Sequence, residues 1–247
     1  MRRLLAVGCE MAATLGAVML LFAVHLLWWT NHTARAEARD EVHRLERQWK
    51  RPGTEASGPP TSGTTSPGSP ADPAAQDKER RAGGSRGAPT TGARPLAPSQ
   101  SFAVLRIPRI GLTVPVAEGV DKHRVLDRGF VGHYTGAALP GETGNVALAG
   151  HRNTHGEPFR RLDRVRPGDT VTLSTADGDF RYRIDSVLPR TSPADSAVIQ
   201  PVPTSATARP PGSAGYRKPG HYLTLTTCTP EFTSRYRMVV WGHLLEA

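Results

Sequence analysis

The run TLTTCTP, from Thr224 to Pro230, decides how the C-terminal part of this chain is interpreted. Together with the Tyr-Leu pair before it, its β-branched and apolar residues favour an extended, half-buried strand. The strand ends on Cys228, and the sequence contains one other cysteine, Cys9. Cys9 lies beside a long apolar stretch near the N-terminus, so a disulfide between the two thiols would have to cross a bilayer. We interpret Cys9 as an inert apolar residue. Cys228 needs another explanation, because exported domains tend to pair or exclude free thiols.

Similar short runs recur through the C-terminal part of the chain, separated by turn sequences such as Pro167-Gly168-Asp169 and Asp177-Gly178-Asp179. They predict strands at Ala103–Ile107, Leu112–Val116, Asn145–Ala149, Thr170–Ser174, Phe180–Val187, Tyr222–Thr227 and Tyr236–Trp241. Seven or eight short strands in about 150 residues favour an all-β fold with a closed or nearly closed barrel. We also expect a helical turn at Pro158–Arg164 and a functional or mobile loop from Pro189 to Pro219.

The N-terminal hundred residues divide by composition. Met11–Trp29 contains no Asp, Glu, Lys or Arg and is long enough to cross a hydrocarbon layer of about 30 Å as a helix. Trp28 and Trp29 stand where an interfacial aromatic belt is expected. We therefore predict a short cytoplasmic tail with a transmembrane signal-anchor (1–32), a charged, solvated helical stalk (33–51), a disordered Pro/Gly/Ser/Thr linker (52–99) and a folded domain (100–247).

The charge of the chain bears on topology and partners. Arg2 and Arg3 precede the apolar span, but Arg35, Arg39, Arg44 and Arg47 follow it, so a bare count opposes an external C-terminal domain. We favour an uncleaved anchor with that domain outside, and a cleaved signal peptide ending near Ala34-Arg35-Ala36 is the alternative. The net charge of +9 fits affinity for lipid headgroups or wall polymer. Without a nucleic-acid motif, we expect no nucleic-acid partner.

Three side chains near predicted strand ends can form a thiol-based catalytic site. His151 follows the strand Asn145–Ala149, and Arg237 begins the last strand nine residues after Cys228, a spacing that suits a short hairpin. A nearby cation favours the thiolate, a histidine can protonate a departing amine, and an arginine can hold an oxyanion. Spacing alone does not establish such a site. The more ordinary interpretation is that the cysteine is buried, the histidine is hydrogen-bonded and the arginine is solvated, each without a catalytic role.

The motifs also resemble a known family. ALAGHRN (147–153), TLTTC (224–228) and an arginine directly before MVVWGHL (238–244) are similar to the sequences around the active site of sortases, the cysteine transpeptidases of Gram-positive surfaces. The resemblance extends over about Phe102–Leu244. It implies a closed eight-stranded β-barrel with short helices behind a transmembrane anchor and a disordered tether. It also implies Cys228 as nucleophile, His151 as acid and base, and Arg237 as the oxyanion and substrate stabiliser.

Other residues near these motifs are candidates for substrate contact. Arg235 competes with Arg237 for the oxyanion role, since both share the same strand parity. Thr226 and Thr227 offer donors beside the thiol. His133 is the rival base; we place it in a loop and interpret it, with Tyr134 beside it, as structural or substrate-adjacent.

The implied reaction is cleavage of an LPxTG-like sorting signal between Thr and Gly, followed by transfer of the thioacyl group to the amine of a cell-wall precursor. The TLTTC motif with a short hairpin to arginine resembles class E sortases of actinobacteria, which are associated with LAxTG signals. No lid motif is present, because Asp72-Pro73 is followed by Ala74. The expected partners are surface proteins with a sorting signal, a wall-precursor amine and the membrane, with the catalytic domain extracellular.

Two other functions remain open at this stage. An anchored cysteine peptidase would hydrolyse the same acyl-enzyme to a free acid. An anchored wall-binding β-module would carry an inert thiol. Because no His/Cys/Asp cluster has metal-ligand spacing in the sequence, we expect no cofactor and no catalytic metal.

Overall fold

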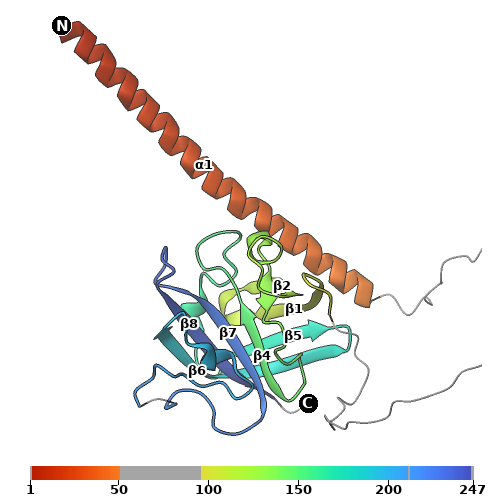
Figure 1. The fold of residues 1–247 in the computed structure, drawn as a ribbon. Helices are drawn as coiled ribbons and strands as arrows, with labels where there is room; N and C mark the ends of the chain where they lie inside the picture. Colours follow the sequence, from red (N-terminus) through yellow and green to blue (C-terminus); the bar gives the residue numbers. More distant parts are fainter. Residues whose placement is uncertain (1, 51–95, 211, 246–247) are drawn as a thin grey trace, which may run out of the picture. The chain divides into compact units, whose positions relative to one another are not determined.

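The computed structural model describes residues 2–50, 96–210 and 212–245, and its C-terminal part is a closed β-barrel (Figure 1). The eight strands are β1 (Ser101–Ile107), β2 (Leu112–Glu118), β3 (Val131–His133), β4 (Gly144–Ala149), β5 (Thr170–Thr175), β6 (Gly178–Thr191), β7 (His221–Thr229) and β8 (Tyr236–Leu244). Four single 3-10 turns lie between them, at η1 (Pro108–Ile110), η2 (Leu126–Arg128), η3 (Leu162–Arg164) and η4 (Ser196–Ile199).

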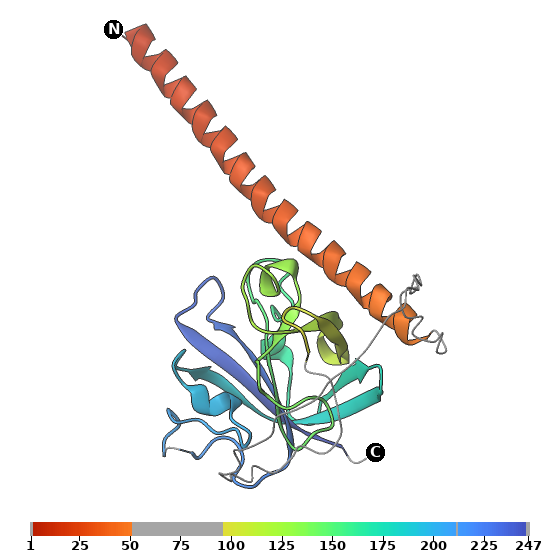
Figure 2. The same cartoon turned by 45° about the vertical axis from the view of Figure 1, so that its right-hand side comes forward.

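The strands follow the order β1-β2-β3-β4-β7-β8-β6-β5, and β5 pairs back onto β1 to close the barrel. Most neighbours are antiparallel, but β2 with β3 and β4 with β7 run parallel. Closure gives each of the eight described strands a neighbour on both sides. Figure 2 shows β7 and β8 side by side as one long hairpin whose turn projects at one end of the barrel.

The interior of the barrel is packed with inward-facing aliphatic and aromatic side chains. Leu105, Leu148, Leu173 and Leu225 come from four different strands and are fully buried in one cluster with Tyr182. Each such side chain contributes about 1.5–3 kcal/mol through removal of its apolar surface from water. This shared core fixes the strand ends, and with them the residues that follow each strand.

The predicted all-β barrel and its seven strands are confirmed, with two differences. The short strand β3 was not predicted, because three residues are too few to show an alternating pattern. The expected loop from Pro189 to Pro219 is partly ordered: β6 continues to Thr191, η4 follows, and Thr204 bridges to Gly215. The buried Asp195 accepts hydrogen bonds from Thr191 and Ser205, which holds the start of this segment in place.

The N-terminal segment forms one uninterrupted helix, α1 (Arg2–Trp49) (Figure 1). Its apolar part is exposed and is long and apolar enough to span a membrane. The prediction of a fully solvated stalk is wrong, because Ala38, Val42 and Leu45 are buried. Val42 and Leu45 pack against Val104 of β1, and Ala38 joins the main barrel core. Most of the predicted linker, 52–95, lies outside the described residues.

Candidate active site

The β7–β8 hairpin brings Cys228 and Arg237 together. Antiparallel pairing places the two residues directly opposite each other, at the end of the hairpin next to its turn. Opposite residues in such a pair project on the same face, with Cβ atoms about 4.5–5.5 Å apart. Cys228 is a free, half-buried thiol. One Arg237 nitrogen donates to the carbonyls of Ser234 and Tyr236, at 2.9 and 3.1 Å, which holds the guanidinium over the hairpin turn.

The parallel pair β4–β7 brings His151 to the same end of the barrel. Ala149, the last residue of β4, pairs with Thr226 of β7. His151, two residues past the end of β4, therefore follows at the level of Cys228, which is still within β7. The Thr227 hydroxyl donates to the Gly150 carbonyl at 2.8 Å. This bond joins the residue before the cysteine to the residue before the histidine.

His151 begins a loop of residues 151–158, and the end of this loop folds back toward its start. The Phe159 amide donates to the His151 carbonyl at 3.0 Å, and the Phe159 ring lies directly beneath Gly150. A Cβ at position 150 would stand 2.8 Å from that ring, so only glycine permits this approach. The next residue, Arg152, is buried and donates to the Thr229 hydroxyl of β7 at 3.3 Å. The loop is therefore fastened at its start to both β7 and the core.

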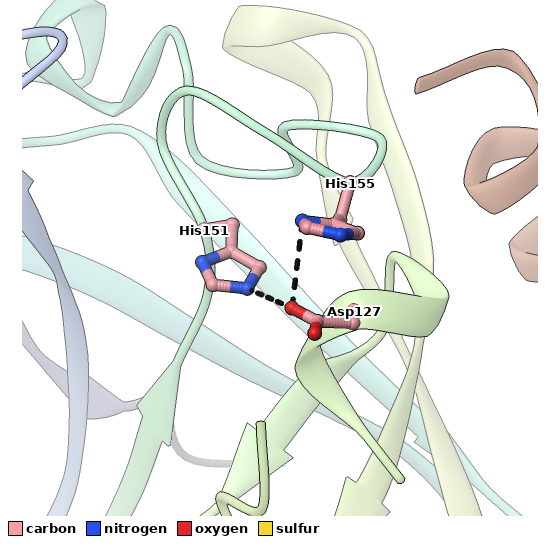
Figure 3. A group of neighbouring side chains, drawn as sticks. All are labelled: Asp127, His151 and His155. Carbon is pink, nitrogen blue, oxygen red and sulfur yellow. Dashed lines mark hydrogen bonds and ion pairs between the residues drawn. The ribbon is translucent and has the colours of Figure 1, made fainter. Parts of the chain in front are cut away.

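An acidic side chain faces the His151 ring. Asp127, in η2, accepts a hydrogen bond from His151 Nε2 at 2.9 Å, and Figure 3 shows the Nδ1 atom of His151 pointing away from this carboxylate. His155 Nδ1 lies 3.4 Å from the same Asp127 oxygen. Burial lowers the pKa of His155 below its ordinary value, although Asp127 opposes this shift. A carboxylate on Nε2 keeps the proton on that nitrogen, so a neutral His151 presents Nδ1 as a free base.

Sequence reasoning identified His151 but missed Asp127 and His155. Asp127 lies 24 residues before His151 in a segment without strand or helix periodicity, and no local motif pairs the two. We also expected no cluster of His, Cys and Asp residues with metal-ligand spacing, and the fold contradicts this by bringing three such side chains together. The ligand atoms of Asp127, His151 and His155 lie within 4.8 Å of one another. The 2.9 Å separation of His151 from Asp127 is that of a hydrogen bond, and the described structure uses the carboxylate in that way.

The residues predicted to contact substrate lie in different environments. The Thr226 hydroxyl donates to the Leu148 carbonyl, so it and Thr227 fasten β7 to β4. Tyr134 is half-buried, with its hydroxyl 3.2 Å from that of Thr226. His133 lies in β3 rather than in a loop, and is buried. Its ring nitrogens contact a Glu118 carboxylate oxygen at 2.6 Å and the Ala138 carbonyl at 3.1 Å, which favours a structural role.

The two arginines are separated by the structure. β8 begins at Tyr236, so Arg235 lies outside the strand and is exposed in the hairpin turn, with its guanidinium 5.3 Å from the Tyr236 ring. Only Arg237 is paired with Cys228 in the sheet register. Geometry therefore favours Arg237 as the partner of the thiol.

A closed eight-stranded barrel with a thiol on the penultimate strand, an arginine opposite it and a histidine at the end of a parallel neighbour defines a sortase-type protein. Residues 105–245 match the family model of the sortase domain. The chain is 41% identical to sortase SrtE1 of Streptomyces coelicolor over 242 residues, and 34% identical to sortase SrtE2 of the same organism over 241 residues. This chain belongs to the sortase family.

Solved structures agree with this assignment. The crystal structure of sortase E1 from Streptomyces coelicolor with a tripeptide in its active site is 50% identical, with a TM-score of 0.55, and the match covers 61% of this chain and 91% of that one. Sortase E from Streptomyces avermitilis is 41% identical with a TM-score of 0.52, with the same coverage of both chains. The chain spans 56% of the length of SrtE1 and 80% of SrtE2, while 96% of it is matched in each.

Proposed function

We propose that this protein is a membrane-anchored cysteine transpeptidase that cleaves a sorting signal of the LAxTG or LPxTG type between Thr and Gly and transfers the acyl group to a cell-wall precursor amine. The observation that carries the proposal is the pairing of Cys228 with Arg237 at the end of the barrel where His151 also emerges. Membership of the sortase family supports the same chemistry.

In the first half of the proposed reaction, His151 Nδ1 takes the proton of the Cys228 thiol, and the resulting thiolate attacks the threonine carbonyl carbon of the signal. The carbonyl oxygen becomes an oxyanion, and the Arg237 guanidinium stabilises it. The tetrahedral intermediate collapses by breaking the Thr–Gly carbon–nitrogen bond. His151 gives the proton on Nδ1 to the departing glycine amine and keeps the proton on Nε2, which Asp127 holds.

In the second half, an acceptor amine attacks the thioester carbonyl, and His151 Nδ1 takes a proton from that nitrogen. The Cys228 sulfur leaves as thiolate, and the new amide links the surface protein to the acceptor. Because protons leave and return through Nδ1, the Asp127 contact on Nε2 persists through both halves. Asp127 is therefore a positioning residue in this scheme.

The remainder of the proposal concerns location. We propose that residues 1–32 form a tail and single-pass anchor, that 33–51 and 52–99 are a stalk and a linker, and that 100–247 form an extracellular catalytic domain. The apolar helix supports the anchor. The stalk differs from the solvated element first expected, because one face of it packs on β1.

The test is product analysis by liquid chromatography and mass spectrometry. The purified full chain in detergent is incubated with LAxTG and LPxTG peptides and diglycine as acceptor. The proposal expects a product in which the peptide up to threonine is joined to diglycine, absent with Cys228→Ala. Free acid alone, with diglycine present, would identify a hydrolase. Intact peptides with both the wild type and the variant would exclude the proposed activity.

A further inference from the structure

The loop that carries His151 contains an unusual turn. His155, Gly156 and Glu157 are three consecutive residues with left-handed backbone angles, at φ values of 53°, 82° and 53°. For the two non-glycine residues this conformation costs free energy, because the Cβ atom crowds the following carbonyl. Such a turn persists only where its surroundings hold it. The structure shows what holds this one.

The supports come from α1, immediately after its apolar span. Arg35 donates through Nε to the Gly156 carbonyl at 3.1 Å and through Nη2 to a Glu157 carboxylate oxygen at 3.0 Å. Asn31 accepts from the Gly156 amide through Oδ1 and donates to the Glu157 carboxylate through Nδ2, both at 3.1 Å. Two helix side chains thus make four hydrogen bonds to two adjacent loop residues.

The carboxylate at the centre of these contacts is buried. Glu157 is 7% exposed and receives a further bond from Arg160 at 2.8 Å. A buried carboxylate is tolerated when opposite charges and donors surround it, and removal of one partner is costly. Glu157 therefore holds the loop at a fixed distance from the helix, as an exposed ion pair would not.

The same stretch of helix also supports the turn that carries Asp127. Glu37 accepts a hydrogen bond from Arg128 at 2.6 Å, and Arg128 directly follows Asp127. The Ala34 carbonyl lies so close to Gly129 that a Cβ there would stand 2.8 Å away. Between Asn31 and Glu37, α1 therefore contacts both the loop that begins at His151 and the turn that contains Asp127.

We propose that Asn31, Arg35 and Glu37 of α1 form a clamp that positions His151 and Asp127, so that the helix following the apolar span is a working part of the active site. This inference rests on the proposed transpeptidase function. Asn31 lies two residues after Trp29, about 3 Å along the helix axis. The clamp therefore ties the catalytic end of the barrel to the base of the anchor itself.

The experiment compares the full wild-type chain in detergent with Asn31→Ala, Arg35→Ala and Arg35→Lys. Arg47→Ala is the matched control, since Arg47 is an exposed arginine of the same helix and forms no ion pair with any described residue. Hydrogen exchange of residues 151–158 measures the clamp without any substrate. Steady-state kinetics with an LAxTG peptide and diglycine then gives kcat, KM and the pH dependence of kcat. Thermal unfolding shows that each variant is folded.

The clamp predicts faster hydrogen exchange of loop 151–158 in Arg35→Ala and Asn31→Ala but not in Arg47→Ala. It predicts a fall in kcat of about tenfold or more in Arg35→Ala with a nearly unchanged KM and a displaced pH profile. Arg35→Lys, which keeps the charge, should recover part of kcat. Unchanged exchange, or a kcat for Arg35→Ala equal to that of Arg47→Ala, would overturn the inference. A wild-type chain that neither cleaves nor ligates the peptide would instead contradict the proposed function, while the exchange result would still test the clamp.

Discussion

The two halves of the candidate active site are held by different forces. Cys228 and Arg237 lie on β7 and β8, where a continuous ladder of backbone pairs sets their separation. His151 lies on a loop, and its orientation depends on side chains from η2, β7 and α1. A substitution leaves the backbone hydrogen bonds of a strand pair in place, whereas it removes a contact that is made by the side chain itself. The strand half, which contains Cys228 and Arg237, should therefore keep its geometry after most single substitutions. The loop half, which contains His151, should lose its geometry more easily.

The largest effect is expected when a side chain of the strand half that takes part in the reaction is removed. Arg237→Ala should lower kcat/KM for acylation by roughly 10²–10³-fold, because the oxyanion loses its donor while the hairpin remains paired. Arg235→Ala is the matched control and should stay close to wild type, since Arg235 lies outside β8. Peptide-cleavage kinetics measures both. Equal losses in the two variants would contradict the assignment by sheet register.

The next effect is expected in the loop half. Asp127→Asn keeps the size of the side chain but replaces the carboxylate that accepts from His151 Nε2. We expect kcat to fall by roughly ten- to a hundredfold through misorientation of the ring, with little change in KM. The rate of cleavage as a function of pH should change shape as well, because the ring loses its charged partner. A variant with wild-type kcat and pH profile would show that the loop alone orients His151.

A smaller effect should come from the hydroxyl that joins the halves. Thr227→Val removes the bond to the Gly150 carbonyl and should cost about 1–3 kcal/mol of stability, because that buried carbonyl loses its donor. Thr226→Val removes a similar bond to Leu148, farther from His151. Chemical denaturation should show comparable losses in both variants, but cleavage kinetics should slow more in Thr227→Val. The reverse order would argue against a link between the halves through this bond.

The smallest effect concerns pH. Burial lowers the pKa of His155, so the unfolded chain takes up this proton at a higher pH than the folded chain does. The associated stability is present above the ordinary histidine pKa of about 6.5 and is lost as the pH falls toward the lowered value. His155→Asn, whose side chain suits the left-handed backbone, should flatten the decrease in unfolding free energy below about pH 6.5. Identical slopes in the variant and wild type would contradict this.

Much of the strand half could be predicted from the sequence. The residues between Cys228 and Arg237 allow a short hairpin, and both flanking runs have strand composition, so local patterns were sufficient. Strand parity did not separate Arg237 from Arg235, because that choice depends on where β8 starts. The existence of the barrel followed from the number and length of the strands. His133 was misplaced in a loop because β3 is only three residues long.

The loop half could be predicted only in part. His151 was found through its motif, but Asp127 reaches it across the fold from a 3-10 turn that has no sequence periodicity. The docked face of α1 shows a helical spacing at Ala34, Ala38, Val42 and Leu45. Half of that stripe is alanine, and the charged residues around it concealed the pattern. The residues that position His151 are joined to it by tertiary contacts, which single-sequence reasoning does not provide.

Intact-protein mass spectrometry of the full chain, after brief incubation with an LAxTG peptide and no acceptor amine, tests whether Cys228 is the nucleophile. We predict a mass increase equal to the acyl group of the peptide up to threonine, mapped by proteolysis to the segment containing Cys228. The increase should be absent in Cys228→Ala and form more slowly in Asp127→Asn. A chain that consumes the peptide without any adduct on Cys228, or that carries the adduct elsewhere, would contradict the role of this thiol as the nucleophile.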